Sequence, residues 1–489
     1  MKFLAFYDLR EYIDALEKRG WLKRIKTPVD CNLEITEITD RVSKMEGDKN
    51  VALLFENVIG YDMPVLMNAF GSKERLALAF GVDDLEEIPN ELREILKLPY
   101  ISLQHKMDLL HIIPTAKRAI NFPKYVKKAP CQEVVITDNP TLDKFPILKC
   151  WPQDGGPFIT LPLVFTRNPK TGKRNVGMYR LQKYDGQTTG MHWHLHKDGA
   201  SNYRAYKEMG MDKIEVAVAI GTDPVVTYSA TAPLPRDIDE MVFAGFLRKK
   251  SVEMVKCKTV DVEVPATSEI VLEGYVNIGE TRREGPFGDH TGYYSLADDY
   301  PVFHITCITH RKNPIYAATI VGKPPMEDCY LAKATERIFL PLLQQAIPEI
   351  RDINFPLEGV FHDCVMVSIK KTYPQQAKKV MHALWGMGQM MFTKLIIVVD
   401  EHVDVQNEKE VWWRVYNNID AKHDLVMVDG PLDALDHSSP MAKWGTKIGI
   451  DATKTWPEEG HTREWPDEIT MSDDIKKIVD NKWKELGLE

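Results

Sequence analysis

Two acids near the middle of the sequence could carry out acid–base chemistry. Glu284 and Asp289 lie in the segment EGPFGDHTGYY and flank a Gly-Pro-Phe-Gly sequence that predicts a turn. Such a turn would bring both carboxylates into one pocket, where like charges raise the pKa of one acid. Arg180 in the same pocket would keep one acid ionised and leave the other free to donate a proton. A surface turn with solvated acids is the simpler alternative, and the glycines, proline and tyrosines around the acids argue against it.

Three histidines at alternate positions form a second candidate site. If Met191–His196 is a strand, His192, His194 and His196 line one face of it, because side chains alternate along a strand. Three imidazoles at this spacing could hold a transition metal. A polar strand face whose histidines bond to the backbone explains the same pattern, and the residues alone favour that interpretation.

Glu240 is the third candidate. It falls in the first turn of a helix predicted to begin near Asp237, where an acidic side chain complements the helix dipole. That structural role is the simplest interpretation of this residue by itself. The sequence contains no nucleophile elbow, phosphate-binding loop or dinucleotide fingerprint that would indicate another chemistry.

The elements that must position these residues change in character along the chain. The first part indicates mixed α and β structure and opens with a helix that Asp8 can cap and Gly20 can end. The middle part has many strand-like runs and few helices, which favours an antiparallel sheet or barrel. Beyond about residue 322, helices and strands alternate, which favours a mostly parallel sheet. A last helix over Asp473–Leu486 could pack on a neighbouring subunit.

Composition bounds the class of protein. The 489 residues are 44% hydrophobic and 27% charged, as in ordinary globular proteins, and the length predicts about three domains. The net charge of −9 argues against a nucleic-acid partner, which would require a basic excess. No signal peptide or membrane-spanning run is visible, and seven separated cysteines without a CxxC pair predict reduced thiols. These features predict a cytoplasmic protein.

Several spaced motifs resemble the UbiD family of non-oxidative decarboxylases, which use prenylated FMN. The motifs are NVGMYR (175–180), MHWHLHKDGA (191–200), LEGYVN (272–277), EGPFGDHTGYY (284–294) and KIGIDATKTWP (447–457). The likeness extends over nearly the whole chain, and the tail is most similar to the ubiquinone-pathway branch. It implies an α+β and α/β multidomain fold with four parts: an N-terminal α/β domain (1–125), a central split β-barrel flavin-binding domain (126–321), a C-terminal α/β oligomerisation domain (322–460) and a tail helix (461–489).

The resemblance also implies a role for each candidate residue. The implied catalytic residues are Asp289, Glu284 and Arg180, although some family members carry Glu in place of Asp289. The implied metal ligands are Asn175, His196 and Glu240, which would bind Mn²⁺ and K⁺ beside the cofactor phosphate. The implied cofactor-binding residues are Met178, Tyr179, Arg180, His192, Trp193, His194, Lys197 and Asp198. The resemblance therefore overrides the dipole interpretation of Glu240 and selects His196 alone from the three histidines.

The reaction implied by the resemblance is decarboxylation of an aromatic acid. The leading substrate is a 3-polyprenyl-4-hydroxybenzoate, converted to a 2-polyprenylphenol in ubiquinone biosynthesis. A naphthoate-type acid in menaquinone biosynthesis and a simple 4-hydroxybenzoate are the alternatives within the family. Two alternatives lie outside it: a zinc-dependent hydrolase built on the three histidines, and a flavin-binding assembly protein without activity.

The resemblance implies partners as well. These are a small-molecule aromatic acid as substrate, a flavin prenyltransferase that supplies the cofactor, and further copies of the chain in a homo-oligomer, either a dimer or a hexamer. A prenylated substrate would also favour peripheral contact with the inner membrane by an otherwise cytoplasmic enzyme.

Overall fold

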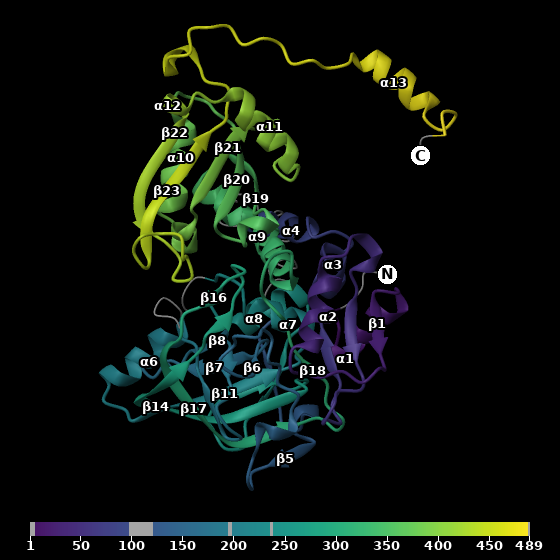
Figure 1. Cartoon of the computed structure of the whole chain (residues 1–489), viewed down its shortest axis with the longest axis vertical. Helices are drawn as coiled ribbons and strands as arrows, with labels where there is room; N and C mark the ends of the chain where they lie inside the picture. Colours follow the sequence, from purple (N-terminus) through teal and green to yellow (C-terminus); the bar gives the residue numbers. More distant parts are fainter. Residues whose placement is uncertain (1–4, 97–120, 194–197, 235–237, 488–489) are drawn as a thin grey trace, which may run out of the picture.

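The computed structural model describes residues 5–96, 121–193, 198–234 and 238–487. Figure 1 shows three regions: an N-terminal region in purple beside a central region in teal, and a C-terminal region in green and yellow above both. Helices and sheets occur in every region, so the multidomain α+β class predicted from the sequence is confirmed.

The described part of the N-terminal region, residues 5–96, forms a four-stranded sheet with β18 and contains four helices. Its strand order is β1 (Leu22–Ile25), β2 (Ala52–Phe55), β3 (Val65–Met67) and β18 (Tyr316–Ala317). The helices are α1 (Leu9–Lys18), α2 (Glu34–Ser43), α3 (Lys73–Phe80) and α4 (Glu87–Leu96). As predicted, the Asp8 side chain caps α1 by accepting a hydrogen bond from the backbone of Glu11. β18 comes from far along the chain, so the end of the central segment contributes a strand to this region.

The central region is built on a seven-stranded antiparallel sheet. The strand order is β10 (Thr188–Gly190), β17 (Asp298–His310), β14 (Ile270–Glu284), β11 (Lys213–Ile220), β7 (Leu163–Arg167) and β8 (Arg174–Met178), and β5 (Val134–Ile136) pairs with β17. Smaller sheets join β4 (Lys124–Val126) to β12 (Glu253–Lys256) and β13 (Glu263–Pro265), β6 (Phe158–Ile159) to β9 (Leu181–Gln182), and β15 (Phe287–Gly288) to β16 (Tyr294–Ser295). The helices are α6 (Asp198–Glu208), α7 (Pro224–Ser229) and α8 (Glu240–Arg248).

One strand prediction in this region is wrong. Residues 191–193 leave β10 and run without regular structure, while 194–196 lie outside the described residues. The backbone of Met191 donates to Pro301, and that of His192 donates to Arg180, so these bonds go to different partners instead of one ladder. His192 therefore does not lie on a strand, and the argument that the three histidines share one strand face does not hold for it.

The C-terminal region is a five-stranded sheet reached through the long helix α9 (Glu327–Ala346). Its order is β19 (Ile350–Asn354), β20 (Cys364–Ile369), β21 (Leu395–Asp400), β23 (Trp444–Asp451) and β22 (Leu425–Pro431). The three central strands are parallel and both edge strands are antiparallel, which agrees with the mostly parallel sheet predicted. The helices are α10 (Gln376–Trp385), α11 (Glu408–Asn418) and α12 (Ala421–Asp424).

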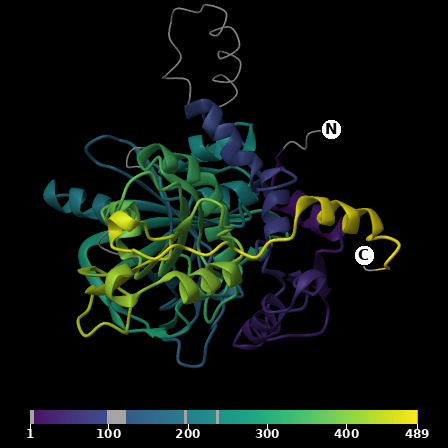
Figure 2. The same cartoon turned by 90° about the horizontal axis from the view of Figure 1, so that it is seen from above.

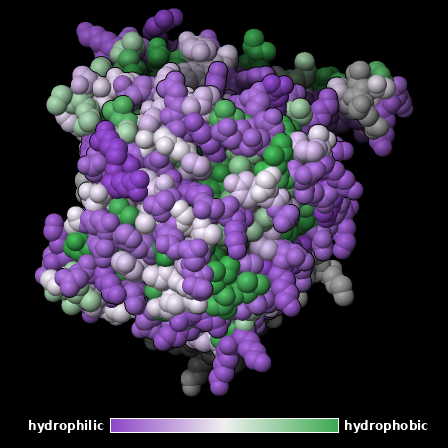
Figure 3. Space-filling model, turned by 60° about the horizontal axis from the view of Figure 1, so that its bottom comes forward, coloured by the Kyte–Doolittle hydropathy of each residue, from purple (hydrophilic) through white to green (hydrophobic). Residues whose placement is uncertain are grey.

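The chain leaves this body through an extended tail. Its helix α13 (Asp473–Lys482) stands clear of the C-terminal sheet, and every residue of it is exposed (Figure 1). Figure 2 shows the tail crossing over the C-terminal region before it reaches α13. The face in Figure 3 is mainly hydrophilic, with scattered apolar patches. Among the described residues, no helix is both long and apolar enough to cross a bilayer.

The pairing of β14 with β17 leads to a test of the fold, because β14 ends at Glu284. A Cβ atom at Gly274 would lie 1.8 Å from the carbonyl oxygen of His304 on β17. We expect Gly274→Ala to destabilise the protein by about 1–3 kcal/mol, since the strands must shift to accept the methyl group. In Gly386→Ala, the nearest atom to the new Cβ is 3.4 Å away, so this control should unfold like the wild type. Equal thermal midpoints for all three proteins would contradict this prediction.

Candidate active site

A single guanidinium joins the two acids predicted from the sequence. Arg180 lies between β8 and β9, Glu284 ends β14, and Asp289 follows β15. The Nε of Arg180 donates to Oε1 of Glu284 at 3.0 Å, and its Nη1 donates to Oδ2 of Asp289. Its Nη2 donates to Oγ of Ser295 at 3.2 Å, and the ring centroid of Phe287 lies 4.3 Å from the guanidinium carbon. The Gly-Pro-Phe-Gly turn therefore brings both acids to one cation, as predicted.

Backbone hydrogen bonds hold this turn in place. The amide of Gly285 donates to the side chain of Gln182 at 2.7 Å, and that of Gly288 donates to Asp154 at 2.8 Å. The amide of Gly155 donates to the carbonyl of Pro286, and a Cβ at Gly155 would lie 2.2 Å from the carbonyl oxygen of Gly285. Only a residue without a side chain permits this close approach, so residues 154–155 pack directly against the loop between Glu284 and Asp289.

Both acids are held ionised. This corrects the prediction that one of them is ionised while the other keeps a proton to donate. Burial raises the pKa of the Asp289 carboxyl, but the charge of Arg180 and the hydrogen bonds from His290 outweigh it and hold that pKa well below its usual range. Burial acts in the same way on Glu284, and the hydrogen bond from His192 and the charge of Arg180 lower its pKa. Because Arg180 contacts both carboxylates, like-charge repulsion does not leave one of them protonated.

Each acid also contacts one histidine. The Nδ1 of His192 lies 2.8 Å from Oε1 of Glu284, and the Nδ1 of His290 lies 2.8 Å from Oδ1 of Asp289. Burial and the nearby Arg180 charge lower the pKa of His192. Burial has the same effect on His290, but Asp289 and more distant acids outweigh it and raise the pKa of that imidazole. His192 is therefore neutral near pH 7, whereas His290 favours the charged form.

Of the residues predicted to bind a flavin, Met178 and Tyr179 directly precede Arg180 in the sequence, and Trp193 directly follows His192. Met178 ends β8, and Tyr179 is buried with its hydroxyl accepting a hydrogen bond from the Gly199 amide at 3.3 Å. Trp193 is also buried, and its indole nitrogen lies near Gly199, where a Cβ would be 2.8 Å away. His194 and Lys197 lie outside the described residues. Asp198 begins α6, but its side chain is not described.

The structure places one predicted metal ligand, Glu240, against the backbone next to another, Asn175. Oε2 of Glu240 accepts a hydrogen bond from the backbone of Val176 at 3.1 Å, next in sequence to Asn175. Glu240 is the first residue of α8, as its helix prediction required, and only 8% of it is exposed. The third predicted ligand, His196, lies outside the described residues. An amide beside a carboxylate is a donor set that suits Mn²⁺, so the residues present fit such an ion.

Four buried polar atoms of this region have no hydrogen-bond partner within the described part of the chain. They are Nδ2 of Asn175, Nε1 of Trp193, Oε2 of Glu284 and Nε2 of His290. A buried polar atom without a partner is costly, so native proteins seldom keep several in one place unless a ligand or water satisfies them. Three of the four belong to predicted site residues and the fourth, on His290, lies beside Asp289, which is consistent with a ligand-binding site.

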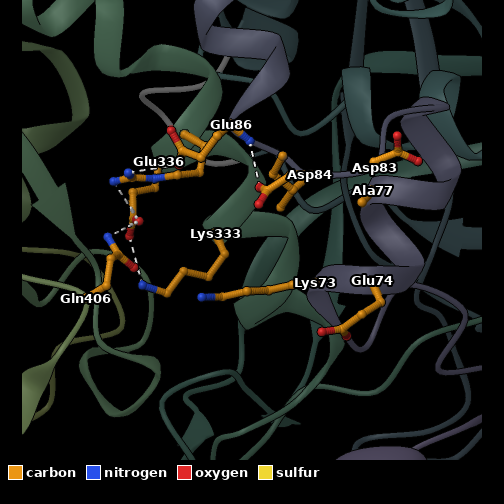
Figure 4. Close-up of a pocket in the computed structure, with 11 residues that line it drawn as sticks. Lys73, Glu74, Ala77, Asp83, Asp84, Glu86, Lys333, Glu336 and Gln406 are labelled. Carbon is orange, nitrogen blue, oxygen red and sulfur yellow. Dashed lines mark hydrogen bonds and ion pairs between the residues drawn. The ribbon is translucent and has the colours of Figure 1, made fainter. Parts of the chain in front are cut away.

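A cavity of about 320 Å³ lies elsewhere, where α3, α9 and the C-terminal region meet (Figure 4). Lys73 extends toward Lys333, whose ammonium is turned toward Glu336 (Figure 4). Its buried charges are already paired, since Lys333 contacts Glu336 at 3.0 Å and Arg337 contacts Glu86 at 3.1 Å. None of the candidate site residues that the structure describes lines this cavity, so we assign the chemistry to the acids at Arg180.

Comparison with protein families decides the class of this site. Residues 13–95, 124–324 and 329–452 match the N-terminal, Rift-related and C-terminal domains described for 3-octaprenyl-4-hydroxybenzoate carboxy-lyase. The chain belongs to the UbiD family. Its relatives include proteins of Archaeoglobus fulgidus, 54% identical over 99% of both chains, and of Aquifex aeolicus, 49% identical over 99% of both, each named only as an uncharacterized protein.

Solved UbiD-class structures share the whole fold. Vanillic acid decarboxylase from Sedimentibacter hydroxybenzoicus, in closed form, has a TM-score of 0.86 at 29% identity, covering 99% of this chain and 100% of that one. The UbiD-class enzyme HmfF from Pelotomaculum thermopropionicum, in complex with FMN, has a TM-score of 0.81 at 30% identity, covering 97% and 100%. An evolved dimeric form of HmfF is in complex with prenylated FMN. By family, then, this chain is an aromatic-acid decarboxylase.

Three residues of the UbiD site were not singled out from the sequence. Ser295 bonds Arg180, the Tyr300 ring packs 4.3 Å from that of His192, and His290 bonds Asp289. Only His290 carried a signal, because it directly follows a predicted catalytic acid in the motif. Ser295 and Tyr300 reach the site through the pairing of β15 with β16 and of β14 with β17, which single-sequence patterns do not specify.

Removing the shared cation tests this electrostatic arrangement. We expect Arg180→Met to destabilise the fold by about 3–5 kcal/mol at pH 7, because two buried carboxylates lose their counter-ion. In the wild type, lowered pKa values make the acids stabilising above their unfolded pKa of about 4. In the variant these pKa values rise, so the deficit should shrink as the pH falls from 7 to 5. Thermal midpoints at both pH values measure this.

The matched control is Arg41→Met, which removes an exposed ion pair with Glu37. Such pairs contribute about 0–1 kcal/mol, so its midpoint should stay near that of the wild type at both pH values. A deficit for Arg180→Met that does not depend on pH would contradict the assignment of lowered pKa values to the two acids.

Proposed function

We propose that this chain decarboxylates a 3-polyprenyl-4-hydroxybenzoate with prenylated FMN bound beside Arg180. The observation that supports this most is the Arg180–Glu284–Asp289 cluster, together with buried polar atoms of Asn175 and Trp193 that have no partner within the described part of the chain. Loss of CO₂ from an aromatic ring leaves an electron pair on carbon. Prenylated FMN supplies an electron sink for that pair, which no side chain offers.

The residues around the proposed flavin divide the remaining work. Arg180 and Glu284 orient the substrate and set the charge of the pocket. Asp289 passes a proton to the ring carbon that has lost CO₂. Since Asp289 rests as an anion, it must receive that proton during turnover. The rings of Tyr300 and His192 pack against each other beside Glu284. Burial and the Glu284 charge raise the pKa of Tyr300 to about 12, so its hydroxyl stays protonated.

We also propose that the site binds metal ions. Asn175, His196 and Glu240 would hold Mn²⁺ and K⁺ against the cofactor phosphate, since Glu240 would repel a phosphate unless a cation lay between them. His194, Lys197 and Asp198 remain proposed cofactor contacts, with Met178, Tyr179, His192 and Trp193. The proposed domains are 1–125, 126–321, 322–460 and 461–489.

A simple 4-hydroxybenzoate is the second candidate substrate. The likeness to vanillic acid decarboxylase over 99% of this chain favours it. We further propose a homo-oligomer, a flavin prenyltransferase as the cofactor source and, for a prenylated substrate, peripheral contact with the membrane. Co-expression with a flavin prenyltransferase, mass spectrometry of the bound molecule and turnover of both acids would test the proposal. A protein that binds no flavin under these conditions would contradict it.

Asp289 can be tested apart from cofactor binding. We expect Asp289→Asn to keep its flavin and to lose about 10²–10⁴-fold in kcat, which is the usual contribution of one acid–base group. Bound flavin is measured by absorbance and turnover by release of CO₂. Asp299→Asn, an exposed acid on β17, is the matched control and should retain both. Turnover near the wild-type rate in Asp289→Asn would remove this residue from the proposed role.

The metal assignment has a separate test. We expect Asn175→Ala and Glu240→Gln each to lose bound manganese and flavin together, because these residues would hold the ion that neutralises the cofactor phosphate. Elemental analysis and flavin absorbance on the same sample measure both. Glu208→Gln, which changes an exposed acid paired with Lys170, should leave both unchanged. Full occupancy of metal and flavin in either site variant would contradict the ligand assignment.

A further inference from the structure

The proposed reaction leaves a question about its proton. Replacing CO₂ by hydrogen on the ring consumes one proton per turnover. Asp289 is 5% exposed and carries a negative charge balanced by Arg180, so it holds no proton of its own to give. A proton source must therefore lie next to Asp289.

His290 is the group in contact with Asp289 on the side away from Arg180. Its Nδ1 lies 2.8 Å from Oδ1 of Asp289, and its backbone amide donates to the same oxygen at 2.8 Å. Only 14% of the His290 side chain is exposed. With Asp289 ionised, Nδ1 must carry the hydrogen of this contact, because a carboxylate can only accept.

The other side of the His290 ring faces the C-terminal region. Its ring centroid lies 4.7 Å from that of Phe361 and 5.7 Å from that of His362. His362 in turn lies 3.3 Å from Asp433 and 3.7 Å from Asp363. Asp328, the second residue of α9, completes the set of titratable groups that act on His290.

These surroundings favour a charged imidazole. Asp289, Asp328 and Asp433 all raise the pKa of His290, against the lowering effect of its burial. Burial raises the pKa of Asp328 to about 6, and the charge of His290 opposes that rise. The Nε2 of His290 is buried without a hydrogen-bond partner within the described residues, so no described donor to Nε2 holds the ring in its neutral form.

We propose that His290 is a positioning residue that stores the proton for this site: its imidazolium passes the Nδ1 proton to the Asp289 carboxylate, and Asp289 then passes a proton to the ring carbon. This inference rests on the proposed function. The aryl carboxylate loses CO₂, the carbon gains one proton, Asp289 returns to its anion, and His290 is left neutral. Water that enters after the product leaves restores the proton on Nδ1, so the net reaction consumes one proton from solvent.

The contrast with His192 identifies which acid receives the proton. His192 contacts Glu284 over the same 2.8 Å that separates His290 from Asp289. The acids that raise the pKa of His192 most are Glu284 and Asp289, both within the cluster, whereas Asp328 and Asp433 act on His290 from outside it. The two imidazole–carboxylate pairs therefore differ in charge, and only the pair at Asp289 contains a proton to transfer.

The first test measures the proton on His290 without any cofactor. The imidazole signals of isotope-labelled protein are followed by NMR against pH and assigned by their absence in His290→Gln. We expect the wild-type His290 midpoint to lie above 6.5, the ordinary histidine value. Asp328→Asn should lower the midpoint, because it removes an acid that favours the charged ring. A wild-type midpoint at or below 6.5 would overturn the proposal.

The second test is the pH profile of kcat with the flavin-loaded enzyme. We expect the wild-type kcat to fall as the pH rises through the His290 midpoint, and Asp328→Asn to move this fall to lower pH. His290→Gln should lose about 10²-fold in kcat near pH 7 with its flavin retained, and recover activity toward acidic pH, where Asp289 takes protons directly.

The control is His304→Gln, which breaks a comparable 2.8 Å contact with Glu280 on the far part of the hairpin. It should leave kcat and its pH profile unchanged.

A His290→Gln enzyme with a kcat within twofold of the wild type and with the wild-type pH profile would overturn the proposal that His290 stores the proton. Should His290→Gln fail to fold, Asp328→Asn decides, and an unshifted profile in that variant overturns the proposal. A loaded wild-type enzyme that decarboxylates no aromatic acid contradicts the proposed function instead, while the NMR midpoint still tests His290.

Discussion

The site depends on the contact of one guanidinium with two buried carboxylates. Glu284 is 1% exposed and Asp289 is 5% exposed, and two anions so placed are unstable without a counter-ion. Arg180 contacts both, and the strands beside these three residues belong to three different sheets: the seven-stranded sheet, the β6–β9 pair and the β15–β16 pair. Formation of the site therefore couples three parts of the structure: the antiparallel sheet, residues 154–155 and the turn between Glu284 and Asp289. Each must be in place before the charges can be buried together.

Around this contact, charged groups alternate in a row: His192, Glu284, Arg180, Asp289 and His290. With His192 neutral and His290 charged, the row carries no net charge, which is what a buried cluster requires. The neutral end packs on Tyr300 of the central region, and the charged end faces the C-terminal region. The two regions thus contribute to opposite ends of one site, and the acid–base state of the site depends on how the C-terminal region packs.

Local patterns predicted much of this fold, and long-range contacts account for what they missed. Asp8 predicted the start of α1 because a cap is a local interaction, and the glycines of the acidic motif predicted the turn that joins Glu284 to Asp289. The strand predicted over Met191–His196 is irregular over 191–193, its described part, because the backbone there bonds to Pro301 and Arg180, which lie far apart in sequence.

The charge states needed the structure as well. The sequence placed Arg180 near the acids but could not show that it contacts both, so the predicted protonated acid was wrong. The charge of His290 depends on Asp328 and Asp433, which are distant in sequence.

The most direct test of the account is a crystal structure of the flavin-loaded enzyme. We expect flavin density against Arg180, with Trp193 and Asn175 contacting the ligand or its ions. Density bound elsewhere, with the Arg180 cluster left unliganded, would contradict the central claim.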